Sequence, residues 1–146
     1  MTLTKSFGYA LRGILYVALT GADQRRIQLD EISQALGLPR YFLGKVMLRM
    51  AKEGILDSGK GHNGGFCVNE RTLSTTLYQL MELTGNPHEA GTCALSLRKC
   101  NALNPCPIHQ EATVINAQWN ALFAHKTIRD LLNKNREGFL ESLIVD

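Results

Sequence analysis

The sequence predicts a mainly α fold with a small β-wing: a winged helix-turn-helix domain followed by a long dimerisation helix. Apolar residues in the N-terminal half recur at steps of three and four, which is typical of amphipathic helices. A glycine-rich stretch lies between two short β-prone runs, directly after the third helical pattern, as a wing would. A second apolar stripe occupies the C-terminal part. At 146 residues, 45% of them hydrophobic, the chain can bury a core.

The first two predicted helices are each defined by an apolar face. The face of the first helix consists of Phe7, Ala10, Leu11, Ile14, Leu15, Ala18 and Leu19. A shorter helix begins at about residue 29, and its face consists of Ile32, Ala35 and Leu36. Gly37-Leu38-Pro39 is the predicted turn, with Pro39 at the first position of the next helix.

The next helix, predicted over residues 40–53, has two contrasting faces, as the reading helix of a helix-turn-helix does. The apolar face consists of Leu43, Val46, Met47 and Met50. The opposite face consists of Arg40, Tyr41, Gly44, Lys45, Arg49 and Lys52. Lys and Arg contact phosphates and read guanine edges, and Tyr can do either. Gly44 places no side chain in the groove and would permit close backbone approach.

A wing and a fourth helix are predicted next. Two strands, over residues 55–58 and 66–69, flank a glycine-rich loop over residues 59–65. The loop residues Lys60, His62 and Asn63 are expected along a minor groove or a row of phosphates. The fourth helix is predicted over residues 74–83, with Ser74 as its N-cap. Its inward residues are Leu77, Leu80 and Met81.

The C-terminal part carries a heptad-like stripe, which is typical of a dimer seam or a core face. The stripe consists of Ile108, Ala112, Ile115, Trp119 and Leu122, and it continues less regularly through Ile128, Leu131 and Leu132. A long helix at this place predicts a homodimer, which also suits an operator with two half-sites. The tail, with Phe139-Leu140 and Leu143-Ile144, predicts a short docking helix. The predicted organisation is a DNA-binding domain over 1–84, a cysteine-rich loop over 85–106 and a dimerisation region over 107–146.

Three cysteines and a histidine lie close together in the sequence. Cys93, Cys100, Cys106 and His109 are separated by six, five and two residues. The surrounding segment is rich in Gly, Asn and Pro and has no apolar periodicity, so burial in a core does not explain the thiols. Soft ligands on a loop suit an iron–sulfur cluster or zinc, although zinc sites usually show closer cysteine pairs. A redox disulfide and a metal-free loop remain open, and His109 could equally be a helix cap or a surface residue.

The charge distribution favours a nucleic-acid partner for the N-terminal half. Residues 1–75 contain ten Lys and Arg against six Asp and Glu, a net charge of +4, whereas residues 76–146 contain six against seven, a net of −1. No stretch approaches the roughly 20 apolar residues of a membrane span, and the N-terminus lacks a separate signal-peptide region. We therefore expect a cytoplasmic protein with no membrane partner. In that compartment clustered thiols point to metal or redox chemistry before structural disulfides.

The whole chain resembles the Rrf family of bacterial winged-helix regulators, whose IscR and NsrR types sense iron–sulfur status and nitric oxide. The resemblance is carried by Leu3-Thr4-Lys5, Tyr9-Ala10, residues 29–36, Gly54-Ile55-Leu56, the wing motif Gly59-x-Gly61-x-x-Gly64-Gly65-Phe66 and the three cysteines. It implies that the cysteines hold a 2Fe–2S or 4Fe–4S cluster. It also implies His109 as the fourth ligand, because Gly8 stands where an NsrR type has an N-terminal acidic ligand.

Together these patterns predict a DNA-binding transcriptional repressor whose operator affinity is set by an iron–sulfur cluster that senses iron–sulfur status, nitric oxide or redox stress. The predicted contacts to double-stranded DNA are Thr4, Lys5, Arg40, Tyr41, Lys45, Arg49, Lys60, His62, Asn63 and Gly64. The alternative is a metal-free regulator of the same fold that responds to thiol oxidation or to a small metabolite. An enzyme is not expected, because the sequence offers no Ser/His/Asp constellation and no paired carboxylates near the cysteines.

Overall fold

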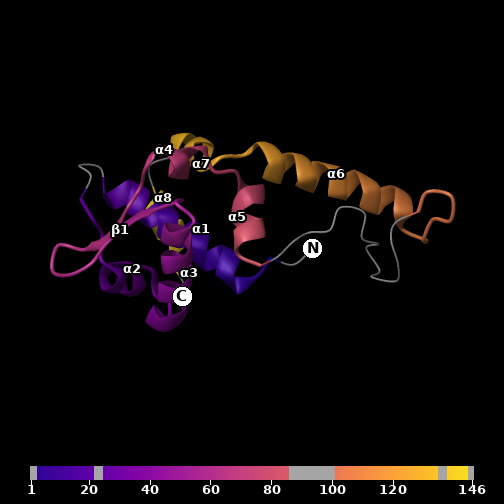
Figure 1. Cartoon of the computed structure of the whole chain (residues 1–146). Helices are drawn as coiled ribbons and strands as arrows, with labels where there is room; N and C mark the ends of the chain where they lie inside the picture. The colour runs from indigo at the N-terminus through magenta and orange to yellow at the C-terminus, as the bar shows by residue number, and fades with distance from the viewer. Residues whose placement is uncertain (1–2, 22–24, 86–100, 135–137, 145–146) are drawn as a thin grey trace.

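The computed structural model describes residues 3–21, 25–85, 101–134 and 138–144, and these form a mainly helical fold with a small antiparallel sheet (Figure 1). The elements in order are α1 (Lys5–Thr20), α2 (Leu29–Leu36), α3 (Arg40–Lys52), β1 (Asp57–Gly59), β2 (Gly65–Cys67), α4 (Glu70–Ser74), α5 (Leu77–Leu83), α6 (His109–His125), α7 (Ile128–Lys134) and α8 (Phe139–Leu143). The predicted fold class is confirmed.

The core is an apolar cluster around α1, which packs against α2, α3, α5, α7 and α8. Ile14 of α1 and Leu43 of α3 are completely buried. The C-terminal helices contribute Phe123, Ile128 and Leu143 to the same cluster. The reading helix and the C-terminal helices therefore share a core rather than meeting only through a linker.

The helix-turn-helix forms where the sequence predicts it. Helix α2 ends at Gly37, whose φ of 67° lies in the left-handed region that glycine adopts without strain. The Ser33 hydroxyl donates to the Leu38 carbonyl at 2.7 Å, and the Leu38 side chain is buried. Pro39 is the N-cap of α3, whereas the prediction made it the first residue inside the helix. These contacts fix the angle at which α3 leaves the turn.

The wing strands are shorter than predicted and are shifted along the chain. Strand β1 pairs with β2 in the register Asp57↔Cys67, Ser58↔Phe66 and Gly59↔Gly65. Ile55 and Leu56 precede β1 and are buried in the core instead of lying in the sheet. Ile27, just before α2, forms an antiparallel bridge with Phe66 through two backbone hydrogen bonds of 2.8 Å. The wing is thus attached to the start of the helix-turn-helix.

The fourth helix predicted over residues 74–83 is present as α5, which begins three residues later, at Leu77, and a short helix that was not predicted, α4, precedes it. Ser74 is the last residue of α4 rather than an N-cap. Asn69 caps α4 and Thr76 caps α5, each in a reciprocal capping box. The expected inward residues Leu77, Leu80 and Met81 are buried as predicted.

The long C-terminal helix is confirmed as α6, and it extends away from the rest of the molecule (Figure 1). It ends at His125 because Lys126 takes an extended conformation, so the stripe through Ile128 and Leu131 belongs to the separate helix α7. The predicted docking helix is present as α8, and its Leu143 is buried. None of the described helices is both long and apolar enough to cross a membrane.

Candidate DNA-binding surface and cysteine segment

The outward face of α3 carries the basic and aromatic side chains that the sequence assigns to DNA. Arg40, Tyr41, Lys45 and Arg49 are all exposed. The Lys45 ammonium lies 4.6 Å from the centroid of the Tyr41 ring, a cation–π contact that holds both side chains on one face. The Arg40 guanidinium bonds the Asp30 carboxylate of α2, which offsets part of its charge.

Gly44 does not lie on this outward face, which corrects the prediction. The residue is buried against α2, and a Cβ built on it would lie 2.9 Å from the Leu29 Cδ2 atom. The absent side chain therefore permits close packing of α2 on α3. It does not bring the backbone of α3 closer to DNA.

The N-terminus of α1 lies beside the reading helix. The Thr4 hydroxyl accepts a hydrogen bond from the Phe7 backbone N–H at 3.1 Å, so its role in the structure is to cap α1. Lys5 is exposed and lines a hollow of about 450 Å³ together with Phe42 and Lys45 of α3. The structure therefore brings Lys5 and Lys45 together from distant parts of the sequence.

The wing loop presents Lys60, His62 and Asn63 to solvent. The Gln28 amide donates to the His62 carbonyl at 2.9 Å, which ties the loop to the start of α2. Gly64 is buried inside the turn, where a Cβ would lie 2.5 Å from the Gly59 carbonyl oxygen. Gly64 thus shapes the loop instead of offering a surface for contact.

Two arginines that the sequence analysis did not assign lie next to the wing. Arg25 and Arg26 line a hollow of about 500 Å³ that also includes His62 and Asn63. Arg25 pairs with Glu31 at 3.2 Å, and both side chains are more than a third exposed. The adjacent basic pair before α2 was visible in the sequence, but its proximity to the wing depends on the Ile27–Phe66 bridge.

The cysteine segment is only partly described. Cys93 and Cys100 lie outside the described residues, whereas Cys106 is half-buried and His109 is the first residue of α6. The His109 backbone N–H donates to the Cys106 carbonyl at 3.0 Å, so the two predicted ligands lie within one turn. A thiolate and an imidazole so placed fit the donor chemistry of an iron–sulfur cluster. Within the described residues alone, no three His, Cys, Asp or Glu side chains gather as a metal site would require.

The predicted dimerisation stripe divides between two sides of α6. Ile108, Ile115 and Leu122 are 44%, 63% and 44% exposed. Ala112 and Trp119 are half-buried, and the Trp119 ring stacks on Phe123 with centroids 4.6 Å apart. The Phe123 ring in turn packs beside the ring of Phe7 in α1, with the two centroids 5.7 Å apart. The Trp119 indole N–H is buried and finds no acceptor among the described residues.

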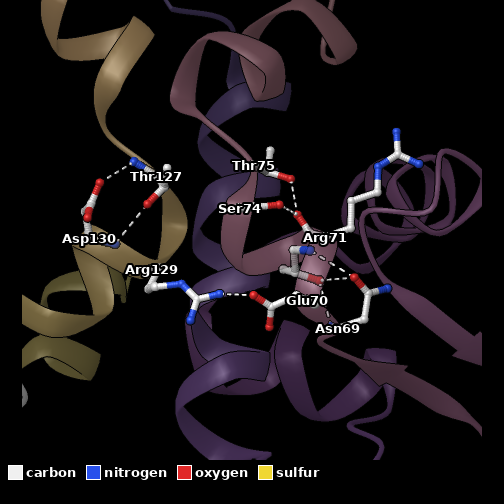
Figure 2. A network of polar contacts seen from close by, with 9 residues as sticks. Asn69, Glu70, Arg71, Ser74, Thr75, Thr127, Arg129 and Asp130 are labelled. Atoms are coloured by element: carbon white, nitrogen blue, oxygen red, sulfur yellow. Dashed lines mark hydrogen bonds and ion pairs between the residues drawn. The ribbon is translucent and has the colours of Figure 1, made fainter.

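The base of α6 is joined to the residues between α4 and α5. The Leu77 N–H donates to the Lys126 carbonyl at 2.9 Å, and the Ile128 N–H donates to the Thr75 carbonyl at 3.0 Å. Figure 2 shows the side-chain part of this junction, where Arg129 of α7 bonds Glu70 of α4. The Thr127 backbone N–H donates to the Asp130 carboxylate at 2.9 Å and holds the pKa of Asp130 below its ordinary value.

Comparison with known proteins agrees with this geometry. The Rrf2 family profile, described as "Iron-dependent Transcriptional regulator", matches residues 3–134. A proposed HTH-type transcriptional regulator of Aquifex aeolicus (strain VF5) is 33% identical over 135 residues, which cover 91% of this chain and 92% of that protein. The HTH-type transcriptional regulator IscR of Klebsiella pneumoniae (strain 342) is 23% identical over 91% of this chain and 80% of its own length.

Solved structures agree on the fold. The structure of CymR, the global cysteine regulator of Bacillus subtilis, superposes with a TM-score of 0.72 and covers 93% of this chain and 99% of that one. The sequence identity is 15%, so this likeness bears on the fold alone.

Proposed function

We propose, from the premise that this chain belongs to the Rrf2 family of transcriptional regulators, that it is a homodimeric repressor whose operator affinity is set by an iron–sulfur cluster. Like its family and relatives, the chain is a DNA-binding transcriptional regulator and not an enzyme. The cluster, the dimer and the sense of regulation belong to the proposal.

The ligands in this proposal are Cys93, Cys100, Cys106 and His109. When bound, a cluster supplies a redox-active centre that oxidants and nitric oxide modify. The observation that carries the proposal is the position of Cys106 and His109 at the start of α6. Ligation there would fix the start of α6 to the remainder of the cysteine segment.

The described residues at the two ends of the cysteine segment lie against functional elements. Gly85, at its N-terminal end, lines a hollow of about 200 Å³ with Lys45 and Arg49 of the reading helix. Cys106, near its other end, leads directly into α6. Loss of the cluster would therefore remove a constraint between these two points and shift the population of DNA-fitting arrangements.

Helix α6 is suited to carry such a change to the DNA-binding elements. Its 17 residues span about 25 Å at 1.5 Å per residue. The far end is held by the backbone hydrogen bonds of Thr75 and Leu77, and Leu77 begins α5. Thr84, which follows α5, lines the same hollow as Lys45 and Arg49. A rigid helix with both ends engaged thus connects the cysteine segment to α3 through α5.

The test compares anaerobically purified protein with the same protein after cluster removal, using an operator selected from random duplexes. We expect visible colour, iron and acid-labile sulfide in the purified dimer by native mass spectrometry, and a change in operator affinity of tenfold or more on removal, about 1.4 kcal/mol. Cys106→Ser should lose the iron, whereas the matched variant Cys67→Ser, in strand β2, should keep it. Equal affinity of the two forms, or an iron-free sample that cannot be reconstituted, would overturn the proposal.

The second candidate is a metal-free regulator that responds to thiol oxidation or to a small metabolite. It is favoured by the three thiols themselves, because cysteines on a polar loop in a reducing compartment suit reversible oxidation as well as metal binding. In this case Cys106→Ser would abolish a response to oxidant in a sample that contains no iron. The same native mass spectra therefore separate the two candidates.

A further inference from the structure

The outward face of α3 contains large apolar side chains between its cations. Tyr41, Phe42 and Leu48 are 66%, 57% and 60% exposed, although each is large and apolar. Single exposed apolar residues are common on protein surfaces, but three on one face of a 13-residue helix form a patch. Tyr41 already belongs to the predicted DNA contacts, whereas nothing so far accounts for Phe42 and Leu48.

Phe42 and Leu48 flank Lys45 on the helix surface. Each is three residues from Lys45, so each lies about 60° around the helix from it, on opposite sides. The two are separated by about 9 Å along the axis of α3, so they would meet different base pairs when the helix lies in a major groove. Phe42 also lines the hollow that is shared with Lys5 and Lys45, so two cations lie near it.

The charge of this face indicates what covers it. Lys45, Arg49 and Lys52 are exposed beside the apolar side chains, and no ion pair of theirs is found within the described part of the chain. A polyanion with apolar groups between its charges is the complementary surface. The DNA major groove is such a surface, and among the four bases only thymine places a methyl group there.

We propose that Phe42 and Leu48 read thymine 5-methyl groups in the operator, one on each side of the contact made by Lys45. This inference rests on the DNA-binding part of the proposed function and is independent of the cluster. Apolar contact specifies a T·A pair without a hydrogen bond, so the two side chains would read two separate thymines in each half-site. Lys45, Arg49 and Lys52 then supply affinity and orientation at phosphates or guanines.

The experiment removes one methyl group at a time from the DNA. An operator is selected from random duplexes with the wild-type dimer, and each thymine of one half-site is replaced by deoxyuridine, which lacks only the 5-methyl group. Affinities are measured for wild type, Phe42→Ala, Leu48→Ala and the apolar replacement Leu48→Met. Lys45→Ala is the matched control on the same face. Sedimentation and thermal unfolding of each variant report assembly and folding separately from DNA binding.

We expect two thymine positions at which deoxyuridine weakens wild-type binding about fourfold, the value of one buried methyl group. Phe42→Ala should abolish the effect at one position and Leu48→Ala at the other, while Leu48→Met keeps both. Lys45→Ala should weaken binding to the thymine operator and to the deoxyuridine operator equally, so the ratio of the two affinities should not change.

Three results would overturn the inference. The first is wild-type binding that is indifferent to every methyl group. The second is methyl sensitivity that persists in both alanine variants. The third is alanine variants that change only the oligomeric state, which would assign the face to a protein contact. Failure of the wild type to bind any duplex would instead refute the proposed function, so the two failures are distinguishable.

Discussion

The salt dependence of operator binding can be calculated from the basic side chains that the structure places on the candidate surface. Five cations of the predicted set are exposed in each protomer: Lys5, Arg40, Lys45, Arg49 and Lys60. Each phosphate that is neutralised contributes about −0.9 to the slope of log K against log salt. Ten contacts in a dimer give a slope of about −9, and eight contacts, if Asp30 cancels the charge of Arg40, give about −7.

Substitution of Lys60 by alanine tests this calculation at the wing. The change removes two contacts from a dimer, so the slope should become shallower by about 2. Arg40→Ala should change the slope less, because the Arg40 guanidinium already bonds the Asp30 carboxylate. Arg129→Ala is the control: it removes a paired surface arginine at the junction of α4 and α7, and the slope should not change.

The assay is fluorescence anisotropy with the selected operator over about a fourfold range of salt, in which wild-type affinity should fall by about four to five orders of magnitude. All variants are compared in the same cluster state. A wild-type slope of about −3 or shallower would contradict the placement of these cations on DNA. So would a slope that Lys60→Ala leaves unchanged. Either result would leave the fold intact and refute the proposed interface.

Three further predictions concern stability and assembly. Thr72→Val should lower the free energy of unfolding in urea by about 2–4 kcal/mol. The buried Thr72 hydroxyl donates to the Ile55 carbonyl and accepts from the Asn69 backbone N–H, and valine would leave both groups unpaired. A loss below about 0.5 kcal/mol would contradict this. Ile115→Glu should convert a dimer to folded monomers in sedimentation, because Ile115 is 63% exposed in the protomer and its replacement leaves the monomer core unchanged. A dimer that persists would exclude this face. Asp130 should titrate by NMR with a pKa below its ordinary value, so its contribution to stability is present above the ordinary pKa and is lost as pH falls through the lower folded pKa. Asp130→Asn should remove this pH dependence. A titration at the ordinary value would argue against the Thr127 hydrogen bond.

Local patterns predicted the helix-turn-helix well, because its determinants lie close together in the sequence. The apolar face of α3 and the Gly37 turn are both readable within a few residues. The division of residues 70–83 into two helices was not readable in this way. The extended backbone at Thr75 and Thr76 is stabilised by pairing with residues 126–128, about fifty positions away. A capping sequence alone does not reveal such a partner.

The position of Gly44 shows a second limit. A helical wheel cannot distinguish a glycine that faces DNA from one that faces a neighbouring helix, because both lack a side chain that would indicate burial. The contact with Leu29 follows from the angle between α2 and α3, which the buried Leu38 turn determines. The cysteine segment poses the opposite problem, since its residue types predict chemistry while its sequence has no periodicity from which to predict geometry.

The division of the α6 stripe connects the dimer proposal to DNA reading. Ile115 and Leu122, seven residues apart, lie exposed on one side of the helix, where a second copy would pack. Trp119 lies between them in sequence but stacks on Phe123, which contacts Phe7 near the start of α1. That start also carries Lys5, beside Lys45 of the reading helix. A shift of the partner helix along α6 would therefore reach the DNA-binding face through packed aromatic rings, in addition to the junction at Lys126.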